Sequence, residues 1–278
     1  MDNRTDLDAA ATSGLIDIGT TRLYHEVRGR GPVMLLISGG MGDAGQWAPV
    51  EPALAEDFTV VTYDWRGFSR SPRPDGWTAT SVTELADDAA ALLRALDLAP
   101  AVVVGHSGGG AIACALVARH AGLVRRAVIY EAPLFAVVPD GKEMVAGAQA
   151  AVERALAERG PRQAFELFIR ADSGDEADNV VEVLGATVWD RVLDNGAVFF
   201  SIALPAIAAF VPDGALMRAS GVPLTVVRGA QNRDTWLAAA SAWLAAATGA
   251  DCGELPGGHG GYVTNPAEFV ALVRRIAR

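Results

Sequence analysis

A single serine stands between two glycines where a short apolar run gives way to a helical pattern. Val102, Val103 and Val104 are β-branched, which predicts a short buried strand. The segment 111–120 carries Ala, Leu and Val at helical spacing, which predicts a helix. The chain must therefore turn sharply from strand to helix around Ser107.

This turn reads G-x-S-x-G, with Gly105 and Gly109 on either side of Ser107. Such a turn strains the backbone of its central residue, and glycines leave room for it. Between a strand and a helix, the pattern is typical of a nucleophile elbow, which exposes a reactive serine oxygen. The alternative is a Gly-Ser loop without a chemical role, which the flanking strand and helix disfavour. A nucleophilic serine also needs a base and an acid.

The base is found by comparing the four histidines of the chain. His25 falls on a predicted hairpin, His106 precedes the serine and should point away from it, and His120 ends a helix at the surface. His259 instead lies in the glycine-rich loop PGGHGGY, directly after the last predicted strand, where α/β sheets place active-site groups. We expect His259 to act as the base rather than as a loop histidine bonded to backbone. It must be neutral to do so, so activity should rise near about pH 6 to 7.

Two carboxylates compete for the role of the acid. Glu131, in IYEAP, ends an apolar strand, where a carboxylate is costly unless it has a partner such as an imidazole. The more usual place is the loop after the penultimate strand, but Asn232 occupies the expected position there and Asp234 follows two residues later. Asp234 is equally suited to cap a helix, and Glu131 to lie at the surface or pair with another segment. The residues favour Glu131 and leave Asp234 as the alternative.

The negative charge that develops on a substrate carbonyl needs two backbone N–H donors. One is expected from Gly108, which follows the serine, and the other from the loop SGGMG, where we select Gly40. The alternative for this loop is a tight turn that simply requires flexible residues.

Strands alternate with helices along most of the chain, which predicts an α/β fold with a mostly parallel sheet and helices on both faces. Between 134 and 217 the pattern is helical without a strand, so we expect a helical cap inserted into the core. The expected division is core 1–133, cap 134–217 and core 218–278. The expected strands are 23–27, 33–38, 58–64, 102–104, 125–133, 222–229 and 251–256, and the expected helices are 47–56, 81–98, 111–120, 234–247 and one from 266.

The most apolar stretch, 197–211, is shorter than a membrane span and contains Pro205, so we expect a buried or pocket-lining helix. Together with the neighbouring stretch FELFIR, it supplies aromatic side chains that favour an apolar, uncharged substrate. These side chains are Phe165, Phe168, Phe199, Phe200 and Phe210.

The formal net charge of −10 disfavours nucleic acid and anionic membranes as partners. The acidic, polar segment 1–10 does not resemble a signal peptide. Cys114 and Cys252 are too few for a disulfide framework or a metal cluster. We therefore expect a cytoplasmic protein that uses neither a metal nor an organic cofactor, with a homodimer left open as its assembly.

Four motifs together resemble the α/β-hydrolase family over nearly the whole chain: SGGMG, YDWRGFSRS, GHSGGG and PGGHGGY. The resemblance implies the α/β-hydrolase fold, with an inserted helical cap, and a serine hydrolase that cleaves esters or lactones through an acyl-enzyme. In YDWRGFSRS, Asp64 and Arg66 are expected to hold the turn in place rather than to react.

Within this family the sequence looks most similar to the zearalenone lactonases, which hydrolyse a macrocyclic lactone. A glutamate in a stretch like YEAPLF serves as their acid, so the resemblance favours Glu131 over Asp234. It also implies Gly40 and Gly108 as the oxyanion donors. A cap tryptophan contacts the ligand in that group, and Trp189, in ATVWDRVL, is the corresponding candidate, with a core tryptophan as the alternative.

Two other classes of protein remain as alternatives. The segment 40–45, GMGDAG, fits a dinucleotide-binding fingerprint with Asp64 about 20 residues on, which would indicate an NAD(P)-dependent oxidoreductase. Pro49 and Pro52 count against it, because they disrupt the helix that should hold the pyrophosphate. A non-catalytic receptor on the same fold is the other alternative, against which the serine, histidine and acid argue.

Overall fold

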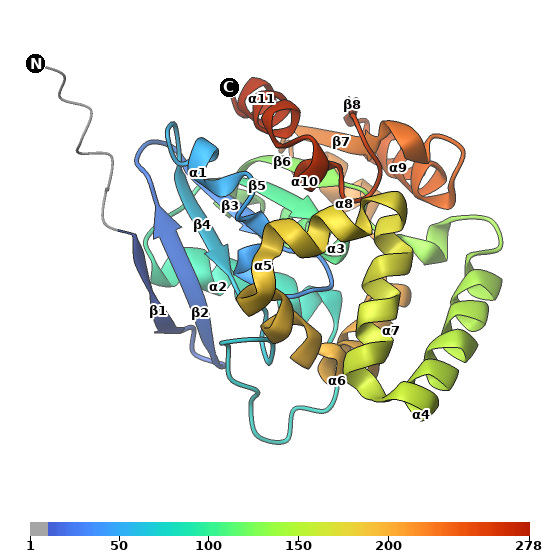
Figure 1. Cartoon of the computed structure of the whole chain (residues 1–278). Helices are drawn as coiled ribbons and strands as arrows, with labels where there is room; N and C mark the ends of the chain where they lie inside the picture. The colour runs from blue at the N-terminus through green and yellow to red at the C-terminus, as the bar shows by residue number, and fades with distance from the viewer. Residues whose placement is uncertain (1–10) are drawn as a thin grey trace, which may run out of the picture.

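The computed structural model describes residues 11–278, which form one eight-stranded sheet with helices on both faces (Figure 1). The acidic segment 1–10, which we distinguished from a signal peptide, lies outside the described residues. No single helix in the described part of the chain combines the length and apolarity that a membrane crossing requires. The fold class predicted from the sequence is confirmed.

The sheet has the strand order β1-β2-β4-β3-β5-β6-β7-β8. β1 and β2 form an antiparallel hairpin, β2 also runs antiparallel to β4, and all further neighbours are parallel. The strands are β1 (Thr12–Asp17), β2 (Arg22–Arg28), β3 (Val33–Ile37), β4 (Thr59–Tyr63), β5 (Ala101–His106), β6 (Val124–Tyr130), β7 (Leu224–Gly229) and β8 (Asp251–Leu255).

The central strands are apolar because helices cover both faces of the sheet. Every residue of β5 is buried, and β3 and β6 are buried along most of their length. Strands with both faces covered read as continuous apolar runs rather than as alternating ones. Their carboxyl ends meet at one edge of the sheet, and this brings the loops after β3, β5, β6 and β8 together.

The core helices flank this sheet, and one of them differs from the prediction. The single helix predicted for 47–56 is instead a 3₁₀ turn, Ala44–Trp47, followed by α1 (Glu51–Leu54). Pro49 explains the break, because a continuous helix would need its missing N–H to reach Gly45. The other core helices are α2 (Val82–Ala95), α3 (Gly108–Arg119), α9 (Trp236–Thr248), α10 (Gly261–Thr264) and α11 (Pro266–Ala277).

A helical insert lies between β6 and β7 and covers the carboxyl edge of the sheet (Figure 1). The expected cap boundary at residue 217 falls inside α8, and α8 packs against α3 and α9 of the core. The insert consists of α4 (Gly141–Ser173), a turn at Gly174–Glu176, α5 (Ala177–Asp194), α6 (Gly196–Val198), a π-helical turn at Phe199–Ala203, α7 (Leu204–Ala208) and α8 (Gly214–Ala219).

Two features of the sequence shape this cap. Gly160 has a φ of 76° ahead of Pro161, so α4 is two helical pieces joined by a break. The apolar stretch 197–211 is helical up to Ala208, and its π-helical turn precedes Pro205, as expected where proline withholds a helical N–H.

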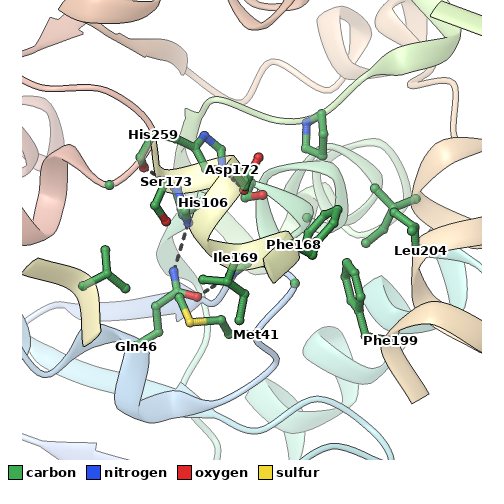
Figure 2. A pocket seen from close by; sticks show the side chains of 18 of the residues that line it. Met41, Gln46, His106, Phe168, Ile169, Asp172, Ser173, Phe199, Leu204 and His259 are labelled. Atoms are coloured by element: carbon green, nitrogen blue, oxygen red, sulfur yellow. Dashed lines mark hydrogen bonds and ion pairs between the residues drawn. The ribbon is translucent and has the colours of Figure 1, made fainter. Parts of the chain in front are cut away.

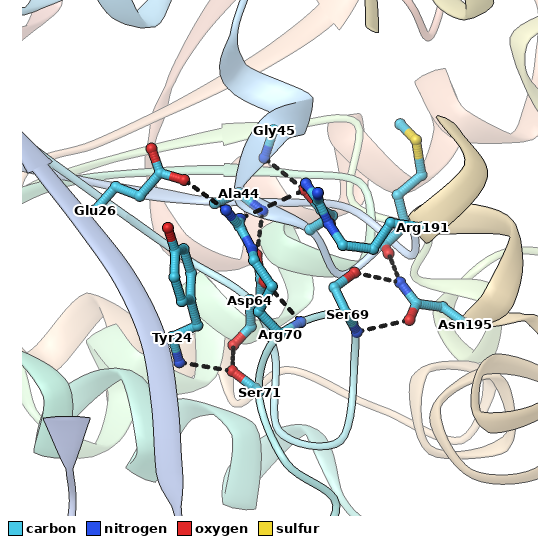
Figure 3. Close-up of polar contacts among 12 residues, drawn as sticks. Tyr24, Glu26, Ala44, Gly45, Asp64, Ser69, Arg70, Ser71, Arg191 and Asn195 are labelled. Carbon is cyan, nitrogen blue, oxygen red and sulfur yellow. Dashed lines mark hydrogen bonds and ion pairs between the residues drawn. The ribbon is translucent and has the colours of Figure 1, made fainter. Parts of the chain in front are cut away.

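Polar contacts fasten the cap to the core (Figure 3). Arg191 of α5 binds both carboxylate oxygens of Asp43, at 2.5 and 2.9 Å. Asn195 donates to the backbone oxygen of Met41 at 2.8 Å and accepts from the backbone N–H of Ser69 at 2.7 Å. The start of α6 is therefore held against the loops that follow β3 and β4.

Candidate active site

Ser107 stands on a tight turn between β5 and α3, with φ 51° and ψ −127°. The flanking glycines are required by close packing as well as by the turn. A Cβ on Gly105 would collide with the backbone oxygen of Gly109, and a Cβ on Gly109 would collide with the backbone oxygens of Ile37 and Ser38. The strained conformation and the cavity beside it match the geometry expected of an exposed nucleophile.

His259 and Glu131 form a buried pair, with 2.8 Å between Nδ1 and Oε2. Glu131 follows β6 with a φ of 46° and is fully buried. Its carboxylate also accepts from the backbone N–H of Gly229 at 2.7 Å and from the Asn232 amide at 2.9 Å. Burial raises the pKa of Glu131, but its bonds to His259, Asn232 and Gly229 outweigh burial and lower it.

The loop after β7 therefore supports the acid instead of supplying it. Asn232, at the position where we expected an acid, donates its amide to Glu131. Asp234 is exposed ahead of α9 and makes no ion pair with His259 among the described residues. The alternative role of Asp234 as a helix cap is also unsupported, because Thr235 stands at the N-cap of α9.

The other imidazole nitrogen of His259 faces a carboxylate of the cap. Oδ2 of Asp172, near the end of α4, lies 3.2 Å from Nε2 (Figure 2). Within residues 11–278 this nitrogen is buried without a hydrogen-bond partner, so it does not bond Ser107 in this arrangement. Burial lowers the pKa of His259, but Asp172, Glu131 and Glu176 outweigh it and raise the pKa to about 9.

This electrostatic setting favours a higher pKa for His259 than the sequence alone suggests. We anticipated an ionisation near neutral pH, yet the described arrangement holds the imidazole of His259 in its charged form at pH 7. A protonated imidazole cannot accept the proton of a serine. A higher pH, or the removal of the Asp172 charge, would favour the neutral form of His259.

Gly40 and Gly108 lie side by side at the wall of the cavity. A Cβ placed on Gly108 would lie 3.6 Å from the backbone nitrogen of Gly40. Among residues 11–278, neither backbone N–H donates to another protein group. Two adjacent, unused N–H donors beside Ser107 form an arrangement suited to binding an oxyanion.

His106 has a role that the sequence did not reveal. His106 is part of the cavity lining, where Nδ1 is 3.0 Å from the Gln46 amide nitrogen and Nε2 is 2.9 Å from the backbone oxygen of His259 (Figure 2). Burial lowers the pKa of His106 far below its ordinary value, so the ring is neutral. It thereby links the loop after β3, through Gln46 and Gly39, to the loop that carries His259.

A cavity of about 70 Å³ lies over Ser107, and its far wall is apolar. Of the aromatic residues expected in a binding site, Phe165, Phe168 and Phe199 line it, whereas Phe200 faces a second cavity of about 620 Å³. Phe135, Phe168 and Leu204 border both cavities.

The structure does not bring Trp189 to this cavity. Trp189 is half-buried on α5 and packs against the hydrophobic core, as in the alternative that we named. The tryptophan that lines the cavity is Trp236, at the start of α9, and it stacks on Phe135 with 4.5 Å between ring centroids. Nothing in the sequence around Trp236 indicated this contact, because it forms between segments far apart in the chain.

The residues that would bind a dinucleotide make structural contacts instead. Asp64 accepts from the backbone N–H of Ala44 at 2.7 Å and from the Arg70 guanidinium at 2.7 Å (Figure 3). The glycine segment 40–45 leads into a single 3₁₀ turn rather than a long helix. Arg66 is also structural, because it donates to Asp88 of α2 at 2.8 Å. Within residues 11–278 no three His, Cys, Asp or Glu side chains are grouped to hold a metal ion.

Comparison with known proteins supports the fold that the four sequence motifs imply. A family model described as the alpha/beta hydrolase fold matches residues 32–170. The uncharacterized hydrolase YraK of Bacillus subtilis is 28% identical over 261 residues, covering 92% of this chain and 93% of that protein. The 2-(acetamidomethylene)succinate hydrolase of Mesorhizobium japonicum is 32% identical over 170 residues, covering 57% of this chain and 60% of that protein.

A solved structure shows the same fold over nearly the whole chain. The enol-lactonase from Burkholderia xenovorans LB400 has a TM-score of 0.76 at 22% identity and covers 95% of this chain and 99% of its own. The family model matches half of the chain and spans the nucleophile elbow, and the sheet order and inserted helices agree with it. The chain belongs to the α/β-hydrolase family.

Proposed function

We propose that this protein is a serine hydrolase that cleaves a carboxylic ester or lactone. Ser107 attacks the carbonyl carbon while His259 takes its proton, and the N–H groups of Gly40 and Gly108 bind the oxyanion. Glu131 orients the imidazole and stabilises its charged form. His259 then gives the proton to the leaving alkoxide, and water hydrolyses the acyl-enzyme. No cofactor enters these steps, and the proposal includes a cytoplasmic location.

One observation carries this proposal. The buried Glu131–His259 pair, at 2.8 Å, opens onto the same cavity as the strained Ser107 and two adjacent unused N–H donors. A glutamate buried at a strand end is costly, and its bonds to His259 and Asn232 offset that cost. Because Oδ2 of Asp172 lies 3.2 Å from Nε2 of His259, on the side where Ser107 would have to bond, the proposed mechanism requires the cap carboxylate to withdraw when substrate binds.

The cavity favours uncharged, apolar substrates. Its far wall consists of aromatic and aliphatic side chains, and burying apolar substrate surface there gains roughly 25 cal/mol per Å². An anionic acyl group would lose its hydration against this apolar wall, which disfavours it as a substrate. The name of the enol-lactonase supports lactone chemistry, and the name of the 2-(acetamidomethylene)succinate hydrolase supports hydrolysis in general.

The test is covalent labelling of Ser107 with a fluorophosphonate, followed by an activity panel. We expect one label per chain and none in Ser107→Ala, whose turnover should fall at least about 10³-fold with its circular dichroism unchanged. The panel contains nitrophenyl esters of rising chain length, γ- and macrocyclic lactones, and an anionic nitrophenyl glutarate beside neutral nitrophenyl valerate.

Activity retained by a folded Ser107→Ala variant would contradict the mechanism. A parent protein that takes no label and cleaves no member of the panel would instead favour the non-catalytic receptor. If the anionic glutarate ester is cleaved faster than the valerate ester, the assignment of an uncharged substrate is wrong while the hydrolase stands.

A further inference from the structure

A second carboxylate of the cap hydrogen-bonds to the loop that carries His259. Glu176 ends the turn between α4 and α5 and is only 5% exposed. Its carboxylate accepts from the backbone N–H of Gly258 at 3.0 Å and from the backbone N–H of Gly260 at 2.7 Å. A third bond comes from the Thr264 hydroxyl at 2.7 Å. The two backbone donors stand immediately before and after His259.

The glycines of the motif PGGHGG make this contact sterically possible. A Cβ on Gly257 would lie 2.5 Å from Oε1 of Glu176, and a Cβ on Gly258 or on Gly260 would lie 3.1 Å from Oε2. Contacts this short would push the carboxylate away from the loop. The glycines around His259 therefore have a specific neighbour, and that neighbour belongs to the cap rather than to the core.

A buried carboxylate needs its bonds simply to offset desolvation, so a purely structural role is the simpler explanation. The placement of Glu176 supports a further role, in positioning His259. Both backbone bonds act on the residues that flank a single side chain, and that side chain is the proposed base. Among residues 11–278, Glu131 contacts Nδ1 of His259, Asp172 lies at Nε2 and His106 contacts the carbonyl oxygen, but none of these groups binds the backbone N–H groups on either side of His259.

We propose that Glu176 is a positioning residue through which the cap fixes the backbone on both sides of His259, and so aligns the imidazole with Ser107 and Glu131. The inference rests on the proposed hydrolase function. It makes the cap part of the catalytic machinery as well as the cover of the cavity. A misplacement of about 1 Å in such a site lowers the rate by roughly 10²-fold.

The experiment compares Glu176→Gln with Glu182→Gln, an exposed glutamate of α5 that provides the matched control. Glutamine at 176 keeps one acceptor oxygen but turns an NH₂ group toward the loop, so at least one backbone bond is lost. On a neutral nitrophenyl ester we expect kcat to fall at least about 10-fold with KM changed less than about threefold. The control should match the parent.

Two further readouts separate positioning from stability. The Nδ1–H proton of His259, bonded to Glu131, should give a downfield NMR signal in the parent and the control, and a broadened or shifted one in Glu176→Gln. Four titratable groups surround this ring: Glu131 after β6, Asp172 on α4, Glu176 in the turn, and His106 on β5. Removing the charge of Glu176 should also move the ascending limb of the pH profile toward acid.

Glu176→Asp keeps the charge but shortens the side chain, and should recover part of kcat. If Glu176→Gln fails to fold, this variant carries the test, with an expected loss in kcat of at least about threefold. An unchanged kcat and NMR signal in a variant with a lowered melting temperature would overturn the positioning role. The NMR signal is independent of turnover, so failure of the hydrolase proposal remains distinguishable.

Discussion

Three carboxylates surround His259, and each contacts different atoms. Glu131 binds Nδ1, Asp172 faces Nε2, and Glu176 binds the backbone on either side. Of the three, Glu131 has the position of a triad acid, because in the proposed mechanism the proton passes between Nε2 and Ser107. Asp172 instead competes for that nitrogen.

Replacing Glu131 tests the assignment of the acid directly. Glu131→Gln should lower kcat by about 10³- to 10⁴-fold, because an amide can favour the wrong imidazole tautomer. Asp234→Asn should stay within about twofold of the parent, since Asp234 is exposed and makes no ion pair with His259 among the described residues. The two variants are assayed side by side, with circular dichroism to check folding. A crippled Asp234→Asn beside a nearly normal Glu131→Gln would place the acid on the loop after β7.

Asp172 is the residue that we expect to control the pH dependence of kcat/KM. With Asp172 in place the pKa of His259 is raised to about 9, so kcat/KM should rise with pH through an alkaline ionisation. Asp172→Asn removes a negative charge that stabilises the imidazolium, so the ascending limb should move toward acid and toward the ordinary value of 6.5. The variant should then be faster than the parent near pH 7. Asp175→Asn, at an exposed position in the turn that follows α4, should leave the profile unchanged.

The elbow packs closely because the first turn of α3 lies directly against the end of β3. Gly109, in the first turn of α3, has no room for a Cβ, because the backbone oxygens of Ile37 and Ser38 already contact it. Gly109→Ala should therefore lower the free energy of unfolding by about 2–4 kcal/mol, as measured by urea denaturation. Gly122→Ala is the control, since no atom lies within 4 Å of the new Cβ, and it should change stability by less than about 0.5 kcal/mol. Equal effects of the two substitutions would refute the packing argument.

For the whole molecule, the relation between cap and core decides which substrates fit. The cavity over Ser107 has about 70 Å³, well below the roughly 300–1,000 Å³ of typical ligand pockets, so we expect the cap to move when a substrate of ordinary size enters. Behind Phe168 and Leu204 lies the second, apolar cavity of about 620 Å³. Shortening a side chain on the shared wall should join the two.

Phe168→Ala should therefore shift the chain-length preference toward longer acyl groups. We expect the ratio of kcat/KM for a decanoyl over a butyryl nitrophenyl ester to rise about 10-fold. Leu167→Ala, which shortens an exposed neighbour on α4, should leave this ratio unchanged. An unaltered ratio in Phe168→Ala would show that the second cavity does not receive substrate.

The sequence by itself determined the α/β fold, the elbow at Ser107, the loop position of His259 and the helical character of the insert. These follow from patterns that repeat locally: apolar runs for covered strands, and glycines where backbones touch. It also ranked Glu131 above Asp234, because a carboxylate at the end of a buried strand requires a partner close by.

Only the tertiary structure decided what surrounds the imidazole. Asp172 and Glu176 lie more than eighty residues from His259 in the chain, on a helix end and a turn without any motif of their own. Trp236, and not Trp189, lines the cavity, and this too depends on contacts between segments far apart in the chain. Long-range contacts of this kind depend on how the cap is seated on the sheet, and that seating is set by packing and ion pairs such as Arg191–Asp43, which leave no local periodicity in the sequence.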